Sequence, residues 1–383
     1  MMNRLTPAQQ DRASGCLLGL AIGDALGATL EFEARDTRPV IRDLVGGGPF
    51  DLAPGQWTDD PAMALCLADS LIAHKGLDTD DLMRRFVNWW RYGENSCTGQ
   101  CFDIGIATLN ALSLFERTGT LASESGDDDR QAGNGTLMRL APVAIFAAPD
   151  IAKAVDLAVA QSRTTHAAPV AHDACAYFAS LLVEAILGAD KEALLAPRVF
   201  EGRAEIADIA AGSWRSKNRD QISSSGYVVH TLEASLWCVH RAASFEEAVI
   251  LAANLADDAD TVAAVTGQLA GAIYGVEAIP QKWREKIAWR GKLTTLSMRL
   301  YSVGGSYHVG ERVYFWTGRG SQGHATIREV RGEHFLLNPE PDAVKGSDYR
   351  ERLHLGRDYW APRDRGVLVY QINTPPQVWW TNF

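Results

Sequence analysis

The stretch 255-LADDADTVAAVTGQLAGAIYG-275 decides how we interpret the chain, because an acidic segment is followed at once by a run of small, apolar residues. The run from Val262 to Gly275 predicts a buried helix. One carboxylate at a helix N-terminus complements the helix dipole. The carboxylates of Asp257, Asp258 and Asp260, however, repel one another unless a cation neutralises them. This stretch therefore predicts a cation site at the start of a core helix.

A second acidic segment, Thr58-Asp59-Asp60-Pro61, precedes another apolar helix predicted over 62–74. Helix capping alone explains this segment if Asp60 is the N-cap and Pro61 the first helical residue. Two helix starts that offer only oxygen ligands instead favour a hard cation, Mg²⁺ or Mn²⁺, provided that tertiary contact joins them. Taken by itself, the second segment leaves both interpretations open.

Glycines recur every four residues near the N-terminus, at positions 15, 19, 23 and 27, and so line one face of a predicted helix. Each glycine costs up to about 1 kcal/mol against alanine inside a helix. We therefore expect this face to allow close approach of another backbone. Asp24 lies within the same apolar run. Because a buried carboxylate is costly, it is predicted to bond backbone groups or to support a metal site.

Helical periodicity dominates residues 11–300, whereas short strand-like runs separated by Gly, Pro and Asp begin near residue 301. We predict an all-α domain over 1–300 and a small β-rich domain over 301–383, for which an SH3-like barrel is one form. The predicted helices include 80–92, 103–118 and 170–187.

The net charge and the positions of the cysteines limit which class of protein the sequence can predict. The 383-residue chain has a net charge of −10, which argues against a general nucleic-acid binder. Residues 301–383 differ, with ten Lys and Arg, nine of them Arg, interleaved with Trp and Tyr. That composition predicts contact with nucleic acid or protein, or aromatic residues that form the domain's own core. Without a signal-like N-terminus or a long apolar run, and with six cysteines mostly in helical runs, a cytoplasmic protein that does not enter membranes is expected.

The segment Gly133-Asn134-Gly135-Thr136 precedes the apolar run LMRLAPVAIFA. Glycines at a helix N-terminus leave backbone N–H groups open to an anion such as a phosphate. Asn-Gly is also a common turn, so this motif alone is weak. His166 lies at another predicted helix boundary, where a capping role and a ligand contact both remain open.

Seven segments, in this order, resemble the ADP-ribosylglycohydrolase family, and within it the bacterial enzymes of the dinitrogenase reductase-activating glycohydrolase type. They are GCLLGLAIGDALGATLEF, GQWTDDPAMAL, CFDIG, AGNGTLMR, TTHAAPVA, SSGYVVHTL and LADDADTVAAVTGQLAGAIYG. The resemblance covers about residues 11–290. It implies an all-α, orthogonal multi-helix bundle with a binuclear Mg²⁺ or Mn²⁺ centre.

The resemblance also implies a set of site residues. The ligands of the two Mg²⁺ or Mn²⁺ ions would be Thr58, Asp59, Asp60, Asp258, Asp260 and Thr261. Asp103 would be the general acid or base and the clamp on the guanidinium, with Glu31 as the alternative and Asp24 as a support. The residues binding ADP-ribose or lining the substrate cleft would be Gly133, Asn134, Gly135, Thr136, Met138, His166, Ser225, Gly226 and Tyr227.

The resemblance thus implies hydrolysis of the N-glycosidic bond between ADP-ribose and an arginine of a protein. The partners would be an ADP-ribosylated protein substrate and the ADP-ribose product. Cations can orient the ribose hydroxyls while carboxylates move protons and hold the guanidine. Two alternatives remain: the same fold acting on another linkage, such as ADP-ribosyl-serine, ADP-ribosylated nucleic acid or a free ADP-ribose derivative, and a non-catalytic ADP-ribose-binding protein.

Overall fold

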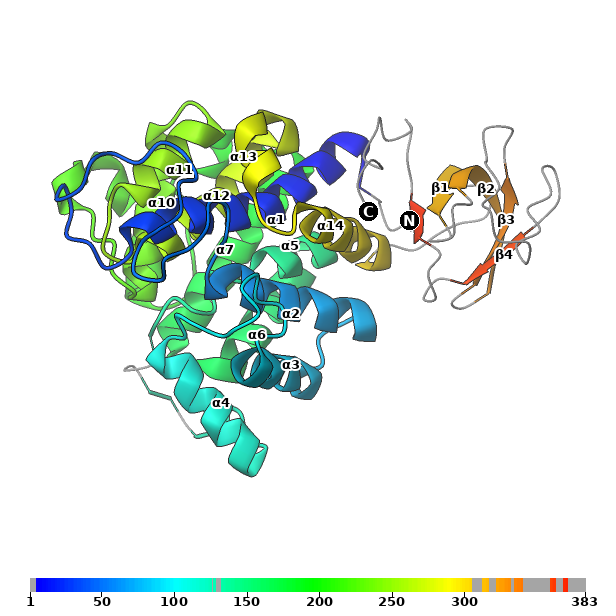
Figure 1. Cartoon of the computed structure of the whole chain (residues 1–383), viewed down its shortest axis with the longest axis horizontal. Coiled ribbons are helices and arrows are strands. Elements are labelled where there is room, and N and C mark those ends of the chain that lie inside the picture. The colour runs from blue at the N-terminus through cyan, green and yellow to red at the C-terminus, as the bar shows by residue number, and fades with distance from the viewer. Residues whose placement is uncertain are drawn as a thin grey trace. The chain divides into compact units, whose positions relative to one another are not determined.

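The computed structural model describes residues 5–125, 127–128 and 132–304, together with five strands near the C-terminus. One compact unit, Ala8–Tyr301, is built from helices (Figure 1). Its described residues contain only two isolated β-bridges, Gly47–Leu52 and Gly133–Tyr227. The predicted all-α character of this part of the chain is confirmed.

The α-helices of this unit are α1 (Pro7–Gly27), α2 (Asp59–His74), α3 (Thr79–Tyr92), α4 (Ile106–Thr118), α5 (Ala141–Ala147), α6 (Ile151–Thr165), α7 (Pro169–Leu187), α8 (Lys191–Leu194), α9 (Ala204–Ala210), α10 (Val228–Arg241), α11 (Phe245–Ala253), α12 (Ala259–Tyr274), α13 (Gln281–Lys286) and α14 (Arg290–Gly304). Short 3-10 turns lie at Ala28–Leu30, Ala122–Ser125, Ser213–Ser216, Arg219–Gln221 and Val276–Ala278.

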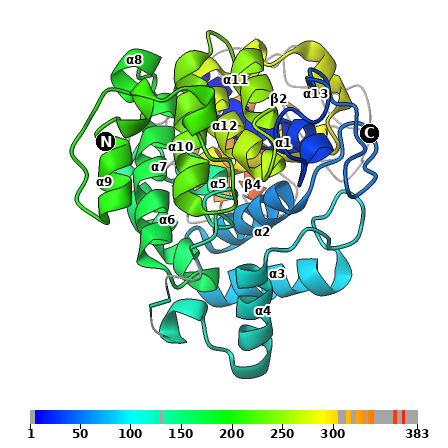
Figure 2. The same ribbon diagram turned by 90° about the vertical axis from the view of Figure 1, so that its left-hand side faces the viewer.

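Helices α1 and α12 lie against each other in the core, with their backbones in direct contact (Figures 1 and 2). The glycine face of α1 meets the small-residue face of α12 in antiparallel order, pairing Gly15 with Gly271, Gly19 with Gly267, Gly23 with Ala263 and Gly27 with Ala259. A Cβ atom added to Gly23 would lie 2.0 Å from the carbonyl oxygen of Ala263. Only glycine allows this approach. The predicted close contact is confirmed, and it brings Asp24 to the start of α12.

Two helical segments, 7–30 and Pro169–Leu187, are long and apolar enough to cross a membrane. The protein interior buries 89% and 78% of their apolar windows, as it does for core helices of soluble folds. These segments are therefore weak evidence for a membrane span. Localisation in the cytoplasm stays a prediction.

Three helices begin at residues other than those predicted. The N-cap of α2 is Thr58 rather than Asp60, because the Thr58 N–H donates to Asp24 and leaves Asp59 as the first helical residue. Helix α4 begins at Ile106, and Asp103 lies in the preceding loop with φ of 59°. Helix α5 begins only at Ala141, since residues 133–140 form turns.

Beyond the helical unit, the described strands are β1 (Arg312–Trp316), β2 (Gln322–Arg331), β3 (His334–Pro339), β4 (Tyr359–Pro362) and β5 (Leu368–Tyr370). They form one antiparallel sheet in the order β4-β3-β2-β1-β5. The β2–β3 register shifts between Ile327 and Glu329. The SH3-like form and the boundary at residue 300 stay predictions.

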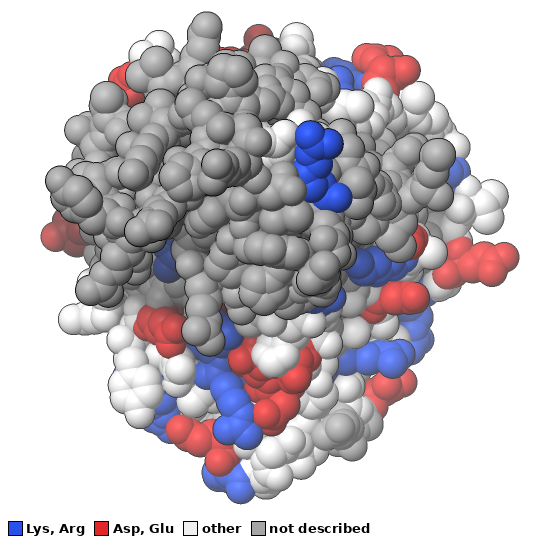
Figure 3. All heavy atoms as spheres, turned by 90° about the vertical axis from the view of Figure 1, so that its right-hand side faces the viewer, with Lys and Arg blue, Asp and Glu red and all other residues white. Residues whose placement is uncertain are grey.

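On the face shown in Figure 3, the described basic and acidic side chains are interspersed. Most side chains of residues 301–383 lie outside the described ones. Contact of this segment with nucleic acid or protein therefore stays a prediction.

Candidate metal centre and active site

Asp24 connects the two acidic helix starts. It is fully buried in α1, and its Oδ1 and Oδ2 accept the backbone N–H and the hydroxyl of Thr58 at 2.8 and 2.7 Å. The Thr58 Oγ1 also lies 3.0 Å from Oδ2 of Asp260, at the start of α12. The two segments that the sequence keeps about 200 residues apart therefore meet, as the cation hypothesis requires.

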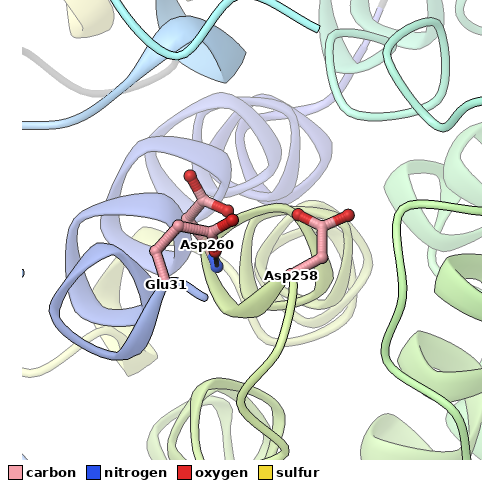
Figure 4. A group of neighbouring side chains, drawn as sticks. All are labelled: Glu31, Asp258 and Asp260. Atoms are coloured by element: carbon pink, nitrogen blue, oxygen red, sulfur yellow. Dashed lines mark hydrogen bonds between the residues drawn. The ribbon is translucent and has the colours of Figure 1, made fainter. Parts of the chain in front are cut away.

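Glu31, Asp258 and Asp260 form the centre of the acidic cluster. One carboxylate oxygen from each lies within 4.8 Å of the others, a spacing that could hold a metal ion. Figure 4 shows the three side chains gathered where α12 begins. Glu31 Oε2 accepts the backbone N–H groups of Ala259 at 2.8 Å and Asp260 at 3.3 Å. The otherwise unpaired N–H groups at this helix N-terminus thereby hold Glu31 in place.

Burial and repulsion between carboxylates raise the pKa of five carboxyl groups at the site, those of Asp24, Glu31, Asp59, Asp60 and Asp258. The pKa values of Asp24, Asp59 and Asp60 lie well above the ordinary value, first because of burial and then because of neighbouring carboxylates. Burial, with the charge of Asp260 next, raises the pKa of Asp258 to about 8. The same two causes raise the pKa of Glu31 strongly. A protein in which these groups are all ionised needs positive charge among them.

Asp60 provides the most direct evidence that this site fits a cation. It is 0% exposed, and no described residue bonds to either of its carboxylate oxygens. A buried carboxylate without a partner costs several kcal/mol, roughly, and natural proteins rarely keep one without a use. Asp59 is also buried on the same helical turn. The oxygen-only donor set matches what Mg²⁺ and Mn²⁺ prefer.

Asp103 lies beside the cluster rather than within it. It is half-buried in the loop before α4, and burial followed by the charges of Asp59 and Asp260 raises its pKa to about 11. Its charge also acts on Glu31. Asp103 thus interacts with Asp260 from a loop residue with positive φ, outside any helix.

Two segments predicted to bind ADP-ribose are paired with each other. Gly133 forms an antiparallel bridge with Tyr227, and the Asn134 N–H donates to the Gly226 carbonyl at 3.1 Å. Asn134 Nδ2 also donates to Thr231 Oγ1 at 2.8 Å and to Asp258 Oδ2. This pairing places the loop at the edge of the acidic cluster.

The predicted helix N-terminus at this loop is wrong, because the N–H groups of Leu137 and Met138 donate to the Asn134 carbonyl in a turn. No described residue accepts from the N–H groups of Gly135 and Thr136, which remain as the donors that could face an anion. Met138 is almost fully buried, and its carbonyl accepts from Gln268 Nε2 at 2.7 Å. Met138 therefore supports the loop from the core.

The His166 ring packs against the loop that contains Gly133 and Gly135. A Cβ atom at Gly133 would lie 3.2 Å from His166 Nε2, and one at Gly135 would lie 3.1 Å from its Cε1. The two glycines thus make room for the imidazole. His166 is only 2% exposed, and burial, with Arg139 next, lowers its pKa to about 3. His166 is neutral at physiological pH.

The remaining predicted site residues are Ser225, Tyr227 and Thr261. Ser225 Oγ is 2.8 Å from His230 Nδ1, and the Tyr227 ring packs edge-on against His230 at 5.0 Å between centroids. The Thr261 N–H donates to Asp260 Oδ1 at 2.7 Å, which places Thr261 in the first turn of α12. Gly226, between Ser225 and Tyr227, lies close to the cluster, since a Cβ atom there would be 3.3 Å from Asp258 Oδ2.

Sequence reasoning missed Arg35, which ties three segments around the site together. Its guanidinium donates to the carbonyls of Leu255, Arg219 and Ile222 at 2.8–2.9 Å. These bonds hold the chain just before Asp258, where Ala256 and Asp257 both have φ near 60°. Such backbone costs of order 1 kcal/mol or more per residue and persists only when the surroundings fix it. No periodicity or motif marks Arg35 in the sequence.

Comparisons with known proteins agree with this geometry. A sequence model of the ADP-ribosylglycohydrolase family matches residues 5–308. The ADP-ribosylarginine hydrolase Tri1 of Pseudomonas putida is 51% identical over 298 residues, which cover 78% of this chain and 80% of the relative. The ADP-ribosyl-dinitrogen reductase glycohydrolase of Rhodospirillum rubrum is 33% identical, covering 73% and 92%. A solved ADP-ribosylglycohydrolase-related protein complex is 41% identical with a TM-score of 0.69, covering 78% of this chain and all of that one.

Proposed function

The chain belongs to the ADP-ribosylglycohydrolase family, and we propose that it hydrolyses the N-glycosidic bond between ADP-ribose and an arginine side chain of a protein. Two relatives support this choice, since one is an ADP-ribosylarginine hydrolase and the other acts on ADP-ribosylated dinitrogen reductase. The products would be ADP-ribose and the unmodified arginine.

The observation that carries the proposal is the closed acidic cluster. Asp24, Thr58 and Asp260 are joined by hydrogen bonds, and no described residue bonds to the nearby carboxylate of Asp60. Natural proteins rarely keep so costly an arrangement without a use. A hydrolase needs it, because positive charge held there can bind the vicinal hydroxyls of the ribose and polarise the sugar.

We assign two Mg²⁺ or Mn²⁺ ions to this cluster, held by Thr58, Asp59, Asp60, Asp258, Asp260 and Thr261. The burial of three of these carboxylates, Asp59, Asp60 and Asp260, and the absence of any nitrogen or sulfur donor among the six support hard cations. When bound, the ions would supply the positive charge that orients the ribose hydroxyls. Asn134 would fix the carboxylate of Asp258 through its Nδ2.

The residues around the cluster would carry the rest of the reaction. Water supplies oxygen to the anomeric carbon, the C–N bond breaks, and the water proton ends on the leaving nitrogen. Asp103 would move this proton and hold the guanidinium, because its carboxyl faces the cluster without being part of a helix start. Glu31 is the alternative proton carrier. Gly135 and Thr136 would direct their N–H groups toward the diphosphate, with His166 supporting the loop.

Release of ADP-ribose is the decisive measurement. Full-length protein would be incubated with arginine-, serine- and nucleobase-linked ADP-ribose, with Mg²⁺ or with EDTA. We expect cleavage of the arginine linkage that EDTA abolishes, and a loss of at least about 100-fold in kcat for Asp103→Ala. Metal-dependent cleavage of a different linkage alone would reassign the substrate. Binding of ADP-ribose without cleavage of any linkage would make the protein a reader.

An unchanged kcat in Asp103→Ala, with Mn²⁺ binding retained, would transfer the proton-carrying role to Glu31. Asp156→Asn is a suitable control, since this exposed residue of α6 belongs to neither the cluster nor its loops. It should retain full activity.

A further inference from the structure

Three phenylalanines form a continuous aromatic surface beside the two candidate proton-carrying residues. Phe32 directly follows Glu31, and Phe102 directly precedes Asp103. The ring of Phe50 lies between them, 6.3 Å from the Phe32 ring and 5.1 Å from the Phe102 ring. We call Phe32, Phe50 and Phe102 the aromatic rim.

Packing alone does not explain the rim, because Phe32 is 66% exposed. Its backbone also has φ of 61°, a left-handed conformation that is a genuine outlier for a bulky residue. Hydrogen bonds to residue 257 fix this conformation, since the Phe32 N–H donates to the Asp257 carbonyl at 2.8 Å and the Asp257 N–H to the Glu33 carbonyl at 2.9 Å. The left-handed backbone of Phe32 costs free energy, and so does the exposure of its aromatic ring to water. Burial of the ring does not offset these two costs.

The middle ring of the rim is also held firmly. Gly47 and Leu52 close the turn that carries Phe50 with two backbone hydrogen bonds of 2.7 and 3.0 Å. Thr29 Oγ1 donates to the Gly46 carbonyl at 3.0 Å and attaches the residue before this turn to the 3-10 turn Ala28–Leu30 that follows α1. A surface presented so rigidly loses little entropy when it binds a ligand.

Chain adjacency puts Phe32 next to Glu31 and Phe102 next to Asp103, the two residues proposed to act at the scissile bond. If Asp103 holds the guanidinium, the aliphatic stem of the arginine must extend past the residues next to Asp103. Planar guanidinium groups and the methylenes attached to them pack well on aromatic faces. Apolar rings beside a carboxylate that holds the guanidinium would therefore recognise the rest of the arginine side chain.

We propose that the aromatic rim is the subsite for the arginine stem of the substrate and that it selects ADP-ribosylated alkylguanidines over ADP-ribosylated guanidine itself. This inference rests on the proposed function, because it takes the guanidinium side of the scissile bond to lie at Asp103. It assigns specificity for the acceptor to three residues that form no part of the acidic cluster.

Two small substrates separate the rim from the rest of the site: ADP-ribosyl-guanidine, which has no stem, and ADP-ribosyl-butylguanidine, which has four methylene or methyl carbons. We expect wild-type kcat/KM to be about tenfold higher for the butyl substrate. Phe32→Asn and Phe50→Ala should each reduce this ratio to about twofold or less. Asparagine suits position 32, since it tolerates positive φ. Val199→Ser removes an apolar side chain that is 94% exposed between α8 and α9 and should leave the ratio unchanged.

Each outcome is decisive. A wild-type ratio near one, with both substrates cleaved, would overturn the rim's role while leaving the hydrolase intact. A high ratio that survives both substitutions would overturn it equally. Cleavage of neither substrate by the wild-type protein would remove the proposed function and the rim's role together. A dimer that forms without substrate and dissociates on Phe32→Asn would assign the rim to a second copy of the chain instead.

Discussion

The carboxylate of Asp24 accepts both the backbone N–H and the side-chain hydroxyl of Thr58, at 2.8 and 2.7 Å. Asp24 thus fixes the first residue of one acidic helix start, and the Thr58 hydroxyl in turn reaches Asp260 of the other. Partners that orient metal ligands in this way typically change metal affinity by about 10–100-fold when they are replaced.

Asp24→Asn is therefore expected to weaken Mn²⁺ binding by about 10–100-fold. Both oxygens of Asp24 accept hydrogen bonds from Thr58, whereas the amide has one oxygen and an NH₂ group that cannot accept the second bond. Titration calorimetry of the metal-free protein would measure this. Asp156→Asn provides the control for loss of one exposed carboxylate. Equal Mn²⁺ affinity in Asp24→Asn and the wild-type protein would show that Asp24 serves folding alone.

Asp60→Asn should change stability in opposite directions with and without metal. Burial and neighbouring carboxylates raise the pKa of Asp60 well above its ordinary value, so the metal-free folded protein bears a free-energy cost at pH 7 whether Asp60 is charged or takes up a proton. Asparagine removes that cost, so we expect the metal-free variant to be more stable by about 1–4 kcal/mol. The variant should also lose most of the increase in Tm that Mg²⁺ gives the wild-type protein. Thermal unfolding with EDTA and with Mg²⁺ would test both, and a destabilised metal-free variant would contradict the prediction.

The pH dependence of the metal-free protein follows from raised carboxyl pKa values. The folded-state pKa of Asp258 is about 8, above its unfolded value near 4, so the folded state binds more protons between these values and stability falls as pH rises. His166 acts oppositely, but its contribution is complete above about pH 6.5, the unfolded value of histidine.

We therefore expect Tm in EDTA to fall from pH 6.5 to pH 8, whereas Mg²⁺ should stabilise the protein more at pH 8 because it competes with fewer protons. Calorimetric scans across this range would test the sign. A Tm in EDTA that rises over the same interval would mean that the clustered carboxylates are already ionised in the metal-free fold.

Contact between α1 and α12 positions the acidic cluster, and Gly23→Ala tests that contact. The added methyl would meet the Ala263 carbonyl at 2.0 Å, so the helices must separate. A loss of about 1–3 kcal/mol in unfolding free energy is expected, together with weaker Mn²⁺ binding. Gly291→Ala is the matched control, because nothing lies within 4 Å of a Cβ there. Equal effects of the two substitutions would contradict a specific role for the α1–α12 contact.

The sequence allowed close backbone approach at the glycine face of α1 and the joining of the two acidic helix starts to be predicted, although it did not identify α12 as the partner of that face. A glycine every four residues is a property of one helix face, and two carboxylates as close as those of Asp258 and Asp260 favour a cation. Asp257, which the sequence counted with them, is exposed. Both inferences depend on local geometry and charge, which the sequence carries directly.

The arrangement of the loops could not be predicted in the same way. The pairing of Asn134 with Gly226 and the left-handed backbone of Phe32 depend on hydrogen bonds between segments far apart in the sequence. The N-cap of α2 is Thr58 rather than the predicted Asp60 for the same reason, since Asp24 of another helix accepts the Thr58 N–H. Tertiary partners of this kind leave no periodic signal.

The tautomer of His166 gives the last prediction. Arg139 Nη2 donates to Thr165 Oγ1 at 2.9 Å, and this hydroxyl lies 3.0 Å from His166 Nδ1. Among the described residues, His166 Nδ1 is the acceptor that remains for the hydroxyl proton of Thr165. His166 is neutral, so Nδ1 accepts that proton and Nε2 carries its own N–H toward Gly133.

Nitrogen-15 NMR of the imidazole should therefore show a protonated Nε2 and an unprotonated Nδ1 in the wild-type protein. Thr165→Val keeps the side-chain shape but removes the hydroxyl, so we expect a mixture of tautomers and about tenfold weaker ADP-ribose binding. Thr164→Val is the matched control, since Thr164 also contacts Arg139 but its hydroxyl donates to the Gln161 carbonyl. A protonated Nδ1 in the wild-type protein would reverse the direction of this chain of hydrogen bonds and leave Nε2 as an acceptor facing the loop.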